Sequence, residues 1–352
     1  MLRPSWHLVA AADEIAHDGD FVTRDVLGTP VLVRNARGHT RAFVNVCAHR
    51  HTLLVSAPRG CARRIRCPYH GWEYDDDGAV CKMPDAACFA PVRRGSDRLS
   101  ELRVESVGPL RFVCLDAAAP SLEASLGAAP MDFLRDSFAA APGDPGLRLA
   151  VSRVLDHPCN WKIPIENVLE SYHVPLLHDG FVARHPRVFR LFEGPARPGL
   201  EEHELGPGYS LVRDRLGARS RIYRGLVERL RPGASVAFAV LHAFPNLLLG
   251  KTGLVRFAQC VLPTSPTTSR SLVRLFLDLG QADRDLGERL LARIADRVAA
   301  ALFDSLMRDD ARIFPSAQRG MEGSAQRGVL GLNEARIHHF HAHLVARRGV
   351  TA

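Results

Sequence analysis

The sequence predicts an α+β fold in which strands and helices are grouped rather than strictly alternating. Short strand-like segments separated by turn residues fill residues 28–116, and a second set lies between residues 236 and 277. An amphipathic helical segment follows each set: one starts near residue 160 and a much longer one near residue 282. This grouping favours mixed strands with flanking helices over an alternating parallel sheet.

Length and composition are those of a globular protein with two domains. The chain has 352 residues, of which 46% are hydrophobic and 24% charged. The net charge of +8 is carried almost entirely by scattered arginines, without a run of five like charges. We therefore interpret the basic residues as a solvated face that could dock an acidic protein, and we expect no nucleic-acid partner.

The N-terminal residues do not resemble a signal peptide, since they lack an apolar core segment. The most apolar stretch, residues 236–249, contains His242, Pro245 and Asn246 and is too short to span a bilayer. We therefore expect a cytoplasmic protein without a membrane partner. Eight cysteines in such a compartment indicate metal binding rather than disulfides.

In the first half of the chain, strands are predicted at Val31–Val33, Ala42–Val44 and Arg111–Cys114, with a turn at Asp75–Gly78. Residues 117–146 are rich in Ala, Pro and Gly and read as a connection. We place the domain boundary within it, giving domains of 1–125 and 126–352.

The second half is predicted to open with a helix from Asn160 to about Tyr172, which Pro175 would end. A long helix is expected from about Ala282 to Asp310 and a short one from Asn333 to Val345. The pentapeptide of residues 316–320 recurs at 324–328, which we interpret as a duplication within a loop. The strands expected between these helices cover residues 236–240, 246–249, 254–261 and 271–277.

Two tight Cys/His pairs form the first candidate metal site: Cys47-x-His49 and, further on, Cys67-x-x-His70. Structural zinc sites usually pair like with like, whereas here each pair offers one thiolate and one imidazole. This pattern resembles a Rieske [2Fe–2S] cluster, in which two Cys hold one iron and two His the other. His51 is interpreted as a neighbour that orients the loop.

The loops lack the extra cysteines and the serine of respiratory-chain Rieske proteins, and carry Tyr69 and Trp72 instead. Fewer hydrogen bonds to the sulfurs should then hold the potential at the low end of the Rieske range, roughly −150 mV.

The second candidate site lies between residues 160 and 178. Glu170 and His173 are spaced to share a helix face, and His178 lies beyond the bend expected at Pro175. Two imidazoles and one carboxylate make the facial triad that holds Fe(II). For the carboxylate we choose Asp310, because it continues an apolar stripe with a spacing of four along the long helix, while Asp304 and Asp309 read as solvated. The stripe consists of Leu286, Leu290, Ile294, Val298, Leu302 and Leu306.

Together the two patterns resemble the Rieske non-haem iron oxygenases, the ring-hydroxylating oxygenase alpha subunits. The resemblance implies a small antiparallel β Rieske [2Fe–2S] domain and a helix-grip catalytic domain, an antiparallel sheet flanked by helices. It implies that Cys47, His49, Cys67 and His70 hold the cluster and that His173, His178 and Asp310 hold a mononuclear Fe(II). Glu170 would bridge His173 to His70 of a neighbouring subunit, within a homotrimer.

The implied activity is that of an oxygenase component with O₂ as co-substrate. A nucleotide-binding fingerprint is missing from the sequence, so a separate NAD(P)H reductase, possibly with a ferredoxin, should supply electrons. We favour monooxygenation, as hydroxylation or oxidative demethylation of a small organic substrate. Aromatic cis-dihydroxylation is the alternative, and an electron carrier without oxygenase activity is the alternative of another class.

Overall fold

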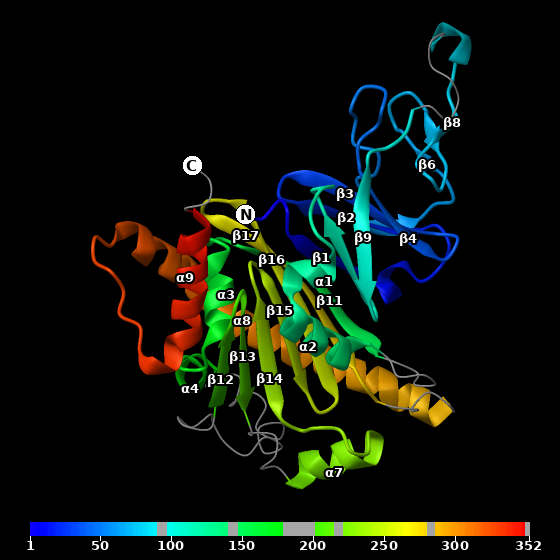
Figure 1. Cartoon of the computed structure of the whole chain (residues 1–352). Coiled ribbons are helices and arrows are strands. Elements are labelled where there is room, and N and C mark those ends of the chain that lie inside the picture. Colours follow the sequence, from blue (N-terminus) through cyan, green and yellow to red (C-terminus); the bar gives the residue numbers. More distant parts are fainter. Residues whose placement is uncertain (90–96, 140–146, 179–200, 215–220, 280–285, 349–352) are drawn as a thin grey trace. The chain divides into compact units, whose positions relative to one another are not determined.

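The structure, a computed structural model, describes residues 1–89, 97–139, 147–178, 201–214, 221–279 and 286–348 (Figure 1). The chain forms two compact units, Met1–Ser125 and Leu126–Ala352. In each unit an antiparallel sheet is the main element.

The first unit contains a seven-stranded sheet with the order β1-β10-β9-β4-β3-β2-β5 and a three-stranded sheet with the order β6-β7-β8. The three strand segments predicted for this half lie in β3, β4 and β10, and the turn at Asp75–Gly78 joins β7 to β8. The strands of the large sheet are β1 (Trp6–Ala11), β2 (Asp20–Val26), β3 (Thr29–Ala36), β4 (His39–Val44), β5 (Arg59–Cys61), β9 (Glu101–Val107) and β10 (Leu110–Cys114). Those of the small sheet are β6 (Ile65–Arg66), β7 (Glu73–Tyr74) and β8 (Val80–Lys82).

One apolar core joins the two sheets of the first unit. Leu32 and Phe43 of the large sheet share it with Ile65, Tyr74 and Val80 of the small one. Cys47 and Cys67 belong to the same buried cluster. The small sheet and its loops are therefore held by hydrophobic packing against the large sheet.

A buried ion pair also fixes the small sheet. Arg34 on β3 is almost fully buried, and its guanidinium lies 3.0 Å from a carboxylate oxygen of Asp76 in the β7–β8 turn. The same guanidinium donates to the carbonyl of Ala62, just before β6. Removing Arg34 would take a buried donor away from Asp76 Oδ1 and from the carbonyl of Ala62.

The second unit is built on a seven-stranded antiparallel sheet with the order β11-β17-β16-β15-β14-β13-β12. The four strand segments predicted between residues 236 and 277 are confirmed as β14 to β17, with ends shifted by a few residues. The strands are β11 (Arg148–His157), β12 (Glu201–Gly206), β13 (Tyr209–Asp214), β14 (Phe238–Ala243), β15 (Leu247–Thr252), β16 (Val255–Ser265) and β17 (Thr268–Leu277).

The helix α8 (Leu286–Gly323) packs along β11 and β17 (Figure 1). The shorter helix α9 (Ala335–Arg348) contacts β12 and β13. The helix α3 (Lys162–Leu169) contacts both α8 and α9. On the β14–β15 side lies α2 (Ala128–Phe138), whose Phe138 ring meets Phe276 of β17. The described helices are completed by α1 (Leu122–Leu126), α4 (Val174–Leu177) and α7 (Arg221–Leu230).

Two expectations about these elements were wrong. The connection at 117–146 contains α1 and the well-packed α2, because Met131, Phe133, Leu134 and Phe138 give it a buried face. The long helix does not end near Asp310 but continues to Gly323, with Pro315 inside it.

The predicted buried stripe of α8 was also wrong. Leu290, Ile294 and Val298 are 60%, 47% and 49% exposed, whereas Phe303 is buried. The face that packs on the sheet carries mainly alanines with Phe303 and Met307. The apolar spacing of four thus marks another face of the helix, and the side chain of Leu286 lies outside the described residues.

Within the described ranges, none of the helices has both the length and the apolar character required to cross a bilayer.

Candidate metal centres

The two Cys/His loops of the first unit share one backbone design. The amide of Cys47 donates to the carbonyl of Thr52, and the amide of Cys67 donates to that of Trp72. In return, each cysteine carbonyl accepts from the amide four residues on, that of His51 or Gly71. These two residues both have positive φ, +58° and +72°. His51 is thus a loop-forming residue, as predicted for a neighbour of the ligands.

The two thiols lie together and out of water. Cys47 and Cys67 are both buried, and burial raises the pKa of the Cys47 thiol, with Cys67 raising it further. Two adjacent buried thiolates repel each other unless cations bind them. The arrangement therefore suits a pair of metal-bound thiolates.

Tyr74 contacts this thiol pair, and the motif reasoning missed it. Its hydroxyl lies 3.1 Å from Cys47 Sγ and accepts the amide N–H of Ala48 at 3.0 Å. Since one oxygen lone pair is occupied by that amide, the hydroxyl hydrogen is free to point at the sulfur. The structure thus adds one contact to a cysteine sulfur, and the expectation of fewer such hydrogen bonds than in respiratory-chain Rieske proteins stays a prediction.

The imidazoles of the two loops also meet. The rings of His49 and His70 are 4.6 Å apart, and His49 stacks on Trp72 at 4.9 Å. His49 Nδ1 is buried without a hydrogen-bond partner, and burial together with the charge of His70 lowers the pKa of His49. A neutral imidazole with an unpaired nitrogen is able to bind a metal ion.

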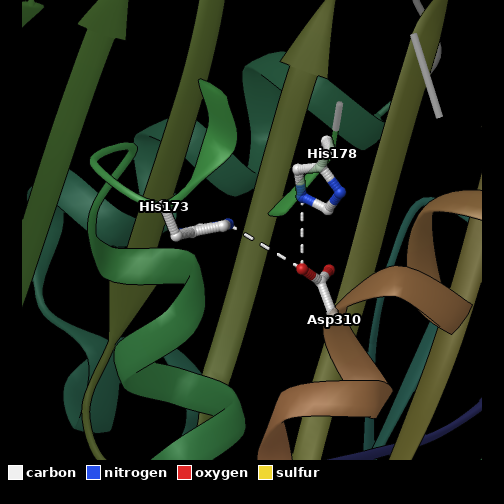
Figure 2. Close-up of side chains that lie close together, drawn as sticks. All are labelled: His173, His178 and Asp310. Atoms are coloured by element: carbon white, nitrogen blue, oxygen red, sulfur yellow. Dashed lines mark ion pairs between the residues drawn. The ribbon is translucent and has the colours of Figure 1, made fainter. Parts of the chain in front are cut away.

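The second unit brings together His173, His178 and Asp310, whose ligand atoms all lie within 4.8 Å of one another (Figure 2). Nε2 of His178 is 3.2 Å and Nε2 of His173 is 3.8 Å from the same oxygen, Asp310 Oδ1. Figure 2 shows the histidines projecting from the segment after α3 and the aspartate from α8. The sequence named these three residues correctly as neighbours.

Local sequence explains how the histidines reach this point. The amide of Lys162 donates to Asn160 Oδ1 at the start of α3, and the amide of Asn160 donates to Gln318 Oε1 on α8. Pro175 occupies the first turn of α4, where proline is favoured, so it starts a helix rather than ending one. His173 and His178 are the residues that flank α4.

Glu170 lies behind His173, but not on a shared helix face as predicted. α3 ends at Leu169, and Glu170 is extended (φ −137°, ψ 165°). Its carboxylate accepts the amides of Tyr172 and His173 and pairs with His173 Nδ1. Burial alone would lower the pKa of His173, but the Glu170 carboxylate and Asp310 raise it overall. Glu170 thus fixes Nδ1 as the protonated nitrogen and leaves Nε2 for a ligand.

Asp309 was predicted to be solvated, and this was wrong. It is only 2% exposed, and its Oδ2 lies 3.8 Å from His178 Nδ1. By contrast Asp304 is partly exposed and pairs with Arg153 of β11. The stripe that was used to choose Asp310 does not follow the packed face of α8, so it gave no information on the burial of Asp309.

An orphaned oxygen supports a metal at this group. Asp310 Oδ1, which faces Nε2 of both histidines, is buried without a hydrogen-bond partner. Buried polar atoms are normally paired, and a carboxylate aimed at two imidazole nitrogens is the donor set of a 2-His-1-carboxylate site.

Comparison with protein families gives two matches. The Rieske [2Fe-2S] domain matches residues 5–102, and the ring hydroxylating alpha subunit (catalytic domain) matches residues 147–349. The chain belongs to the ring-hydroxylating alpha-subunit family. The resemblance inferred from the motifs is thereby confirmed, and the two matched domains imply a Rieske [2Fe–2S] cluster and a mononuclear iron.

The chain is similar to a carnitine monooxygenase oxygenase subunit of Escherichia coli, 34% identical over 178 residues. That match covers 50% of this chain and 46% of the enzyme, about half of each. Choline monooxygenase of Beta vulgaris is 27% identical over 346 residues, covering 96% of this chain and 71% of that protein.

Solved structures agree on the fold. A quaternary ammonium Rieske monooxygenase in complex with L-carnitine superposes with a TM-score of 0.70 at 21% identity, covering 99% of this chain and 89% of that one. Naphthalene 1,2-dioxygenase from Rhodococcus sp. superposes with a TM-score of 0.74, also at 21% identity, covering 98% and 89%. The predicted fold class is thus confirmed.

Proposed function

We propose that this protein is the oxygenase component of a Rieske non-haem iron monooxygenase. The observation that carries the proposal is the convergence of two imidazole nitrogens on one buried carboxylate oxygen, in a chain that also has a Rieske domain. An electron carrier would have no use for that convergence.

The ligand roles follow from the two centres. We assign Cys47 and Cys67 to one cluster iron and His49 and His70 to the other. His173, His178 and Asp310 would hold the mononuclear iron, which leaves coordination positions open. When bound, the two groups supply single electrons and O₂ activation, which no protein side chain provides.

The protein side chains do the positioning. Glu170 holds the Nδ1 proton of His173 and keeps its Nε2 directed at Asp310. The backbone amide of Asn160, just before α3, donates to Gln318 of α8, so the segment that leads to the two histidines is linked to the helix that carries Asp310. Rigid supports of this kind are what a metal site needs for a fixed ligand geometry.

Glu170 is also our candidate for the link between the centres. We propose that it contacts His70 of a neighbouring subunit in a homotrimer, with electrons from a separate NAD(P)H reductase and possibly a ferredoxin. Its position supports this: the carboxylate that binds His173 is followed in the chain by the exposed side chains of Tyr172 (76%) and, in α4, Leu176 (87%). The homotrimer and the cytoplasmic location stay predictions.

Monooxygenation is favoured over dihydroxylation by the relatives. A choline monooxygenase matches along nearly the whole chain, and carnitine monooxygenase subunits match over half of it. We therefore propose hydroxylation or oxidative demethylation of a small organic substrate. Biphenyl 2,3-dioxygenase subunit alpha of Rhodococcus jostii, 35% identical over 175 residues, keeps aromatic cis-dihydroxylation as the second candidate.

Iron content tests the proposal directly. The loaded protein should hold about three irons per chain, and Asp310→Ala should lower this to about two while the visible absorbance of the cluster is unchanged. Metal analysis and absorbance of the purified proteins measure both. A wild-type value of about two would support an electron carrier and contradict the oxygenase.

The reaction type is tested with a surrogate reductase and a panel of small substrates that includes quaternary ammonium compounds and aromatics. Mass spectrometry should find one oxygen atom from ¹⁸O₂ in the product, or loss of a methyl group as formaldehyde. Incorporation of two oxygen atoms into an aromatic ring would instead establish the dioxygenase alternative.

A further inference from the structure

Two consecutive aspartates of α8 lie against opposite nitrogens of one histidine. Asp310 Oδ1 is 3.2 Å from His178 Nε2, and Asp309 Oδ2 is 3.8 Å from His178 Nδ1. Successive helical residues point about 100° apart, so neighbouring side chains can approach the two edges of one imidazole ring. All three side chains are buried.

Asp309 and His178 Nδ1 lie close to each other in the interior of the unit. Asp309 is 2% exposed, and its Oδ2 is 3.8 Å from His178 Nδ1. The Nδ1 atom is buried and has no hydrogen-bond partner in the structure. A carboxylate oxygen at this distance is placed to accept a proton from that nitrogen.

Metal binding at Nε2 makes the two groups complementary. A neutral imidazole that binds a metal through one nitrogen carries its proton on the other. The Nδ1–H of His178 would then face the carboxylate of Asp309, and closing the 3.8 Å gap by less than about 1 Å gives a normal hydrogen bond.

We infer that Asp309 is the positioning residue of His178, accepting its Nδ1–H when Nε2 binds iron. It is the counterpart of Glu170, which does the same for His173. Both imidazoles of the triad are then oriented by a carboxylate from outside the ligand set. This inference rests on the proposed iron site.

The test is the affinity of the mononuclear site for Co(II), measured anaerobically by chelator competition on protein whose cluster is intact. Asp309→Leu removes the acceptor and should bind Co(II) about 10–100-fold more weakly than wild type. Asp309→Asn keeps an acceptor without the charge and should fall between the two. The matched control is Asp304→Asn on the same helix, which should bind as wild type does.

A second readout is the EPR spectrum of the nitric oxide adduct of the Fe(II) form, which should change in Asp309→Leu and not in Asp304→Asn. Wild-type affinity in Asp309→Leu overturns the inference. If that variant does not fold, unchanged affinity in Asp309→Asn overturns it instead. The wild-type protein should bind Co(II) at a site that is lost in His173→Ala. If no such site is found, the proposed function fails, and with it the site to which Asp309 is assigned.

Discussion

At the scale of single residues, carboxylates and a phenol tune groups that the metals would use. Tyr74 contacts the Cys47 sulfur, Glu170 holds His173, and Asp309 lies beside His178. Each of these three residues contacts a proposed metal ligand and is not itself a ligand. Such outer contacts set ligand orientation and basicity.

We predict that Tyr74→Phe lowers the reduction potential of the cluster. Its hydroxyl can donate to the sulfur, and a hydrogen bond to a thiolate favours the more negatively charged, reduced state. If the bond favours that state by about 1.4 kcal/mol, the drop is on the order of 60 mV. A redox titration followed by visible absorbance measures it.

The control is Tyr69→Phe, in the same loop region, whose hydroxyl accepts from Arg50 at 3.3 Å. The Tyr69 variant should keep the wild-type potential. An equal potential in Tyr74→Phe and wild type would mean that the hydroxyl makes no such bond when the cluster is bound.

Glu170→Gln is predicted to keep both metals and to lose coupled turnover by about 10–100-fold. The amide can still contact His173 but cannot carry the charge that a link between two imidazoles needs. Iron analysis and product formed per electron consumed are the measurements. Glu166→Gln, on α3 and paired with His341, is the control, and full activity in the Glu170 variant would refute the link.

At the scale of elements, α8 shows how packing selects one face of a helix. Its sheet-facing side carries alanines, Phe303 and Met307, and this side continues to Asp310 and Phe314. Small residues let the helix lie close to β11 and β17. The larger Leu290, Ile294 and Val298 are directed outward.

Phe303→Ala is therefore predicted to cost about 3–5 kcal/mol of unfolding free energy, because it opens a cavity between α8 and the sheet. Leu290→Ala, at a 60% exposed position, should change it by about 0.5 kcal/mol or less. Denaturant unfolding of both variants compares them. If Leu290→Ala lost more unfolding free energy than Phe303→Ala, the face that carries the apolar residues four apart would be the packed one.

The repeated pentapeptide shows that identical local sequences adopt different conformations in this chain. Residues 316–320 are helical within α8, while the identical residues 324–328 are irregular. The first copy contains Ala317, which packs near Phe314, and Gln318, which binds the amide of Asn160. Its conformation follows from these distant contacts.

At the scale of the whole molecule, the second unit depends on neutral buried histidines. His242 on β14 is buried, its Nε2–H donates to the carbonyl of Pro245 at 3.1 Å, and its ring meets Phe340 of α9. Burial lowers the pKa of His242 to about 3. Burial also lowers the pKa of His157, which lies against Ser271.

Acid should therefore destabilise the fold. The pKa of His242 is about 3 in the folded protein and 6.5 for an unperturbed histidine, so the unfolded state binds the extra proton between these pH values. The stabilisation is complete above about pH 6.5 and is lost progressively as the pH falls toward 3, at up to about 1.4 kcal/mol per pH unit.

His242→Gln should flatten this dependence, and denaturant unfolding between pH 7 and pH 4.5 measures it. The exposed His338→Gln on α9 should keep the wild-type slope. An unchanged slope in the His242 variant would show that other groups dominate the response to acid.

The sequence by itself predicted the two Cys/His loops, because Cys47, His49, Cys67 and His70 lie within spacings of a few residues and turn geometry is local. It also named His173, His178 and Asp310. The tertiary structure alone decided why Asp310 is buried, that Asp309 is buried beside it, and that Tyr74 reaches a sulfur. Those facts depend on which face of a helix or strand packs against elements distant in the chain, and a local apolar pattern does not specify that choice.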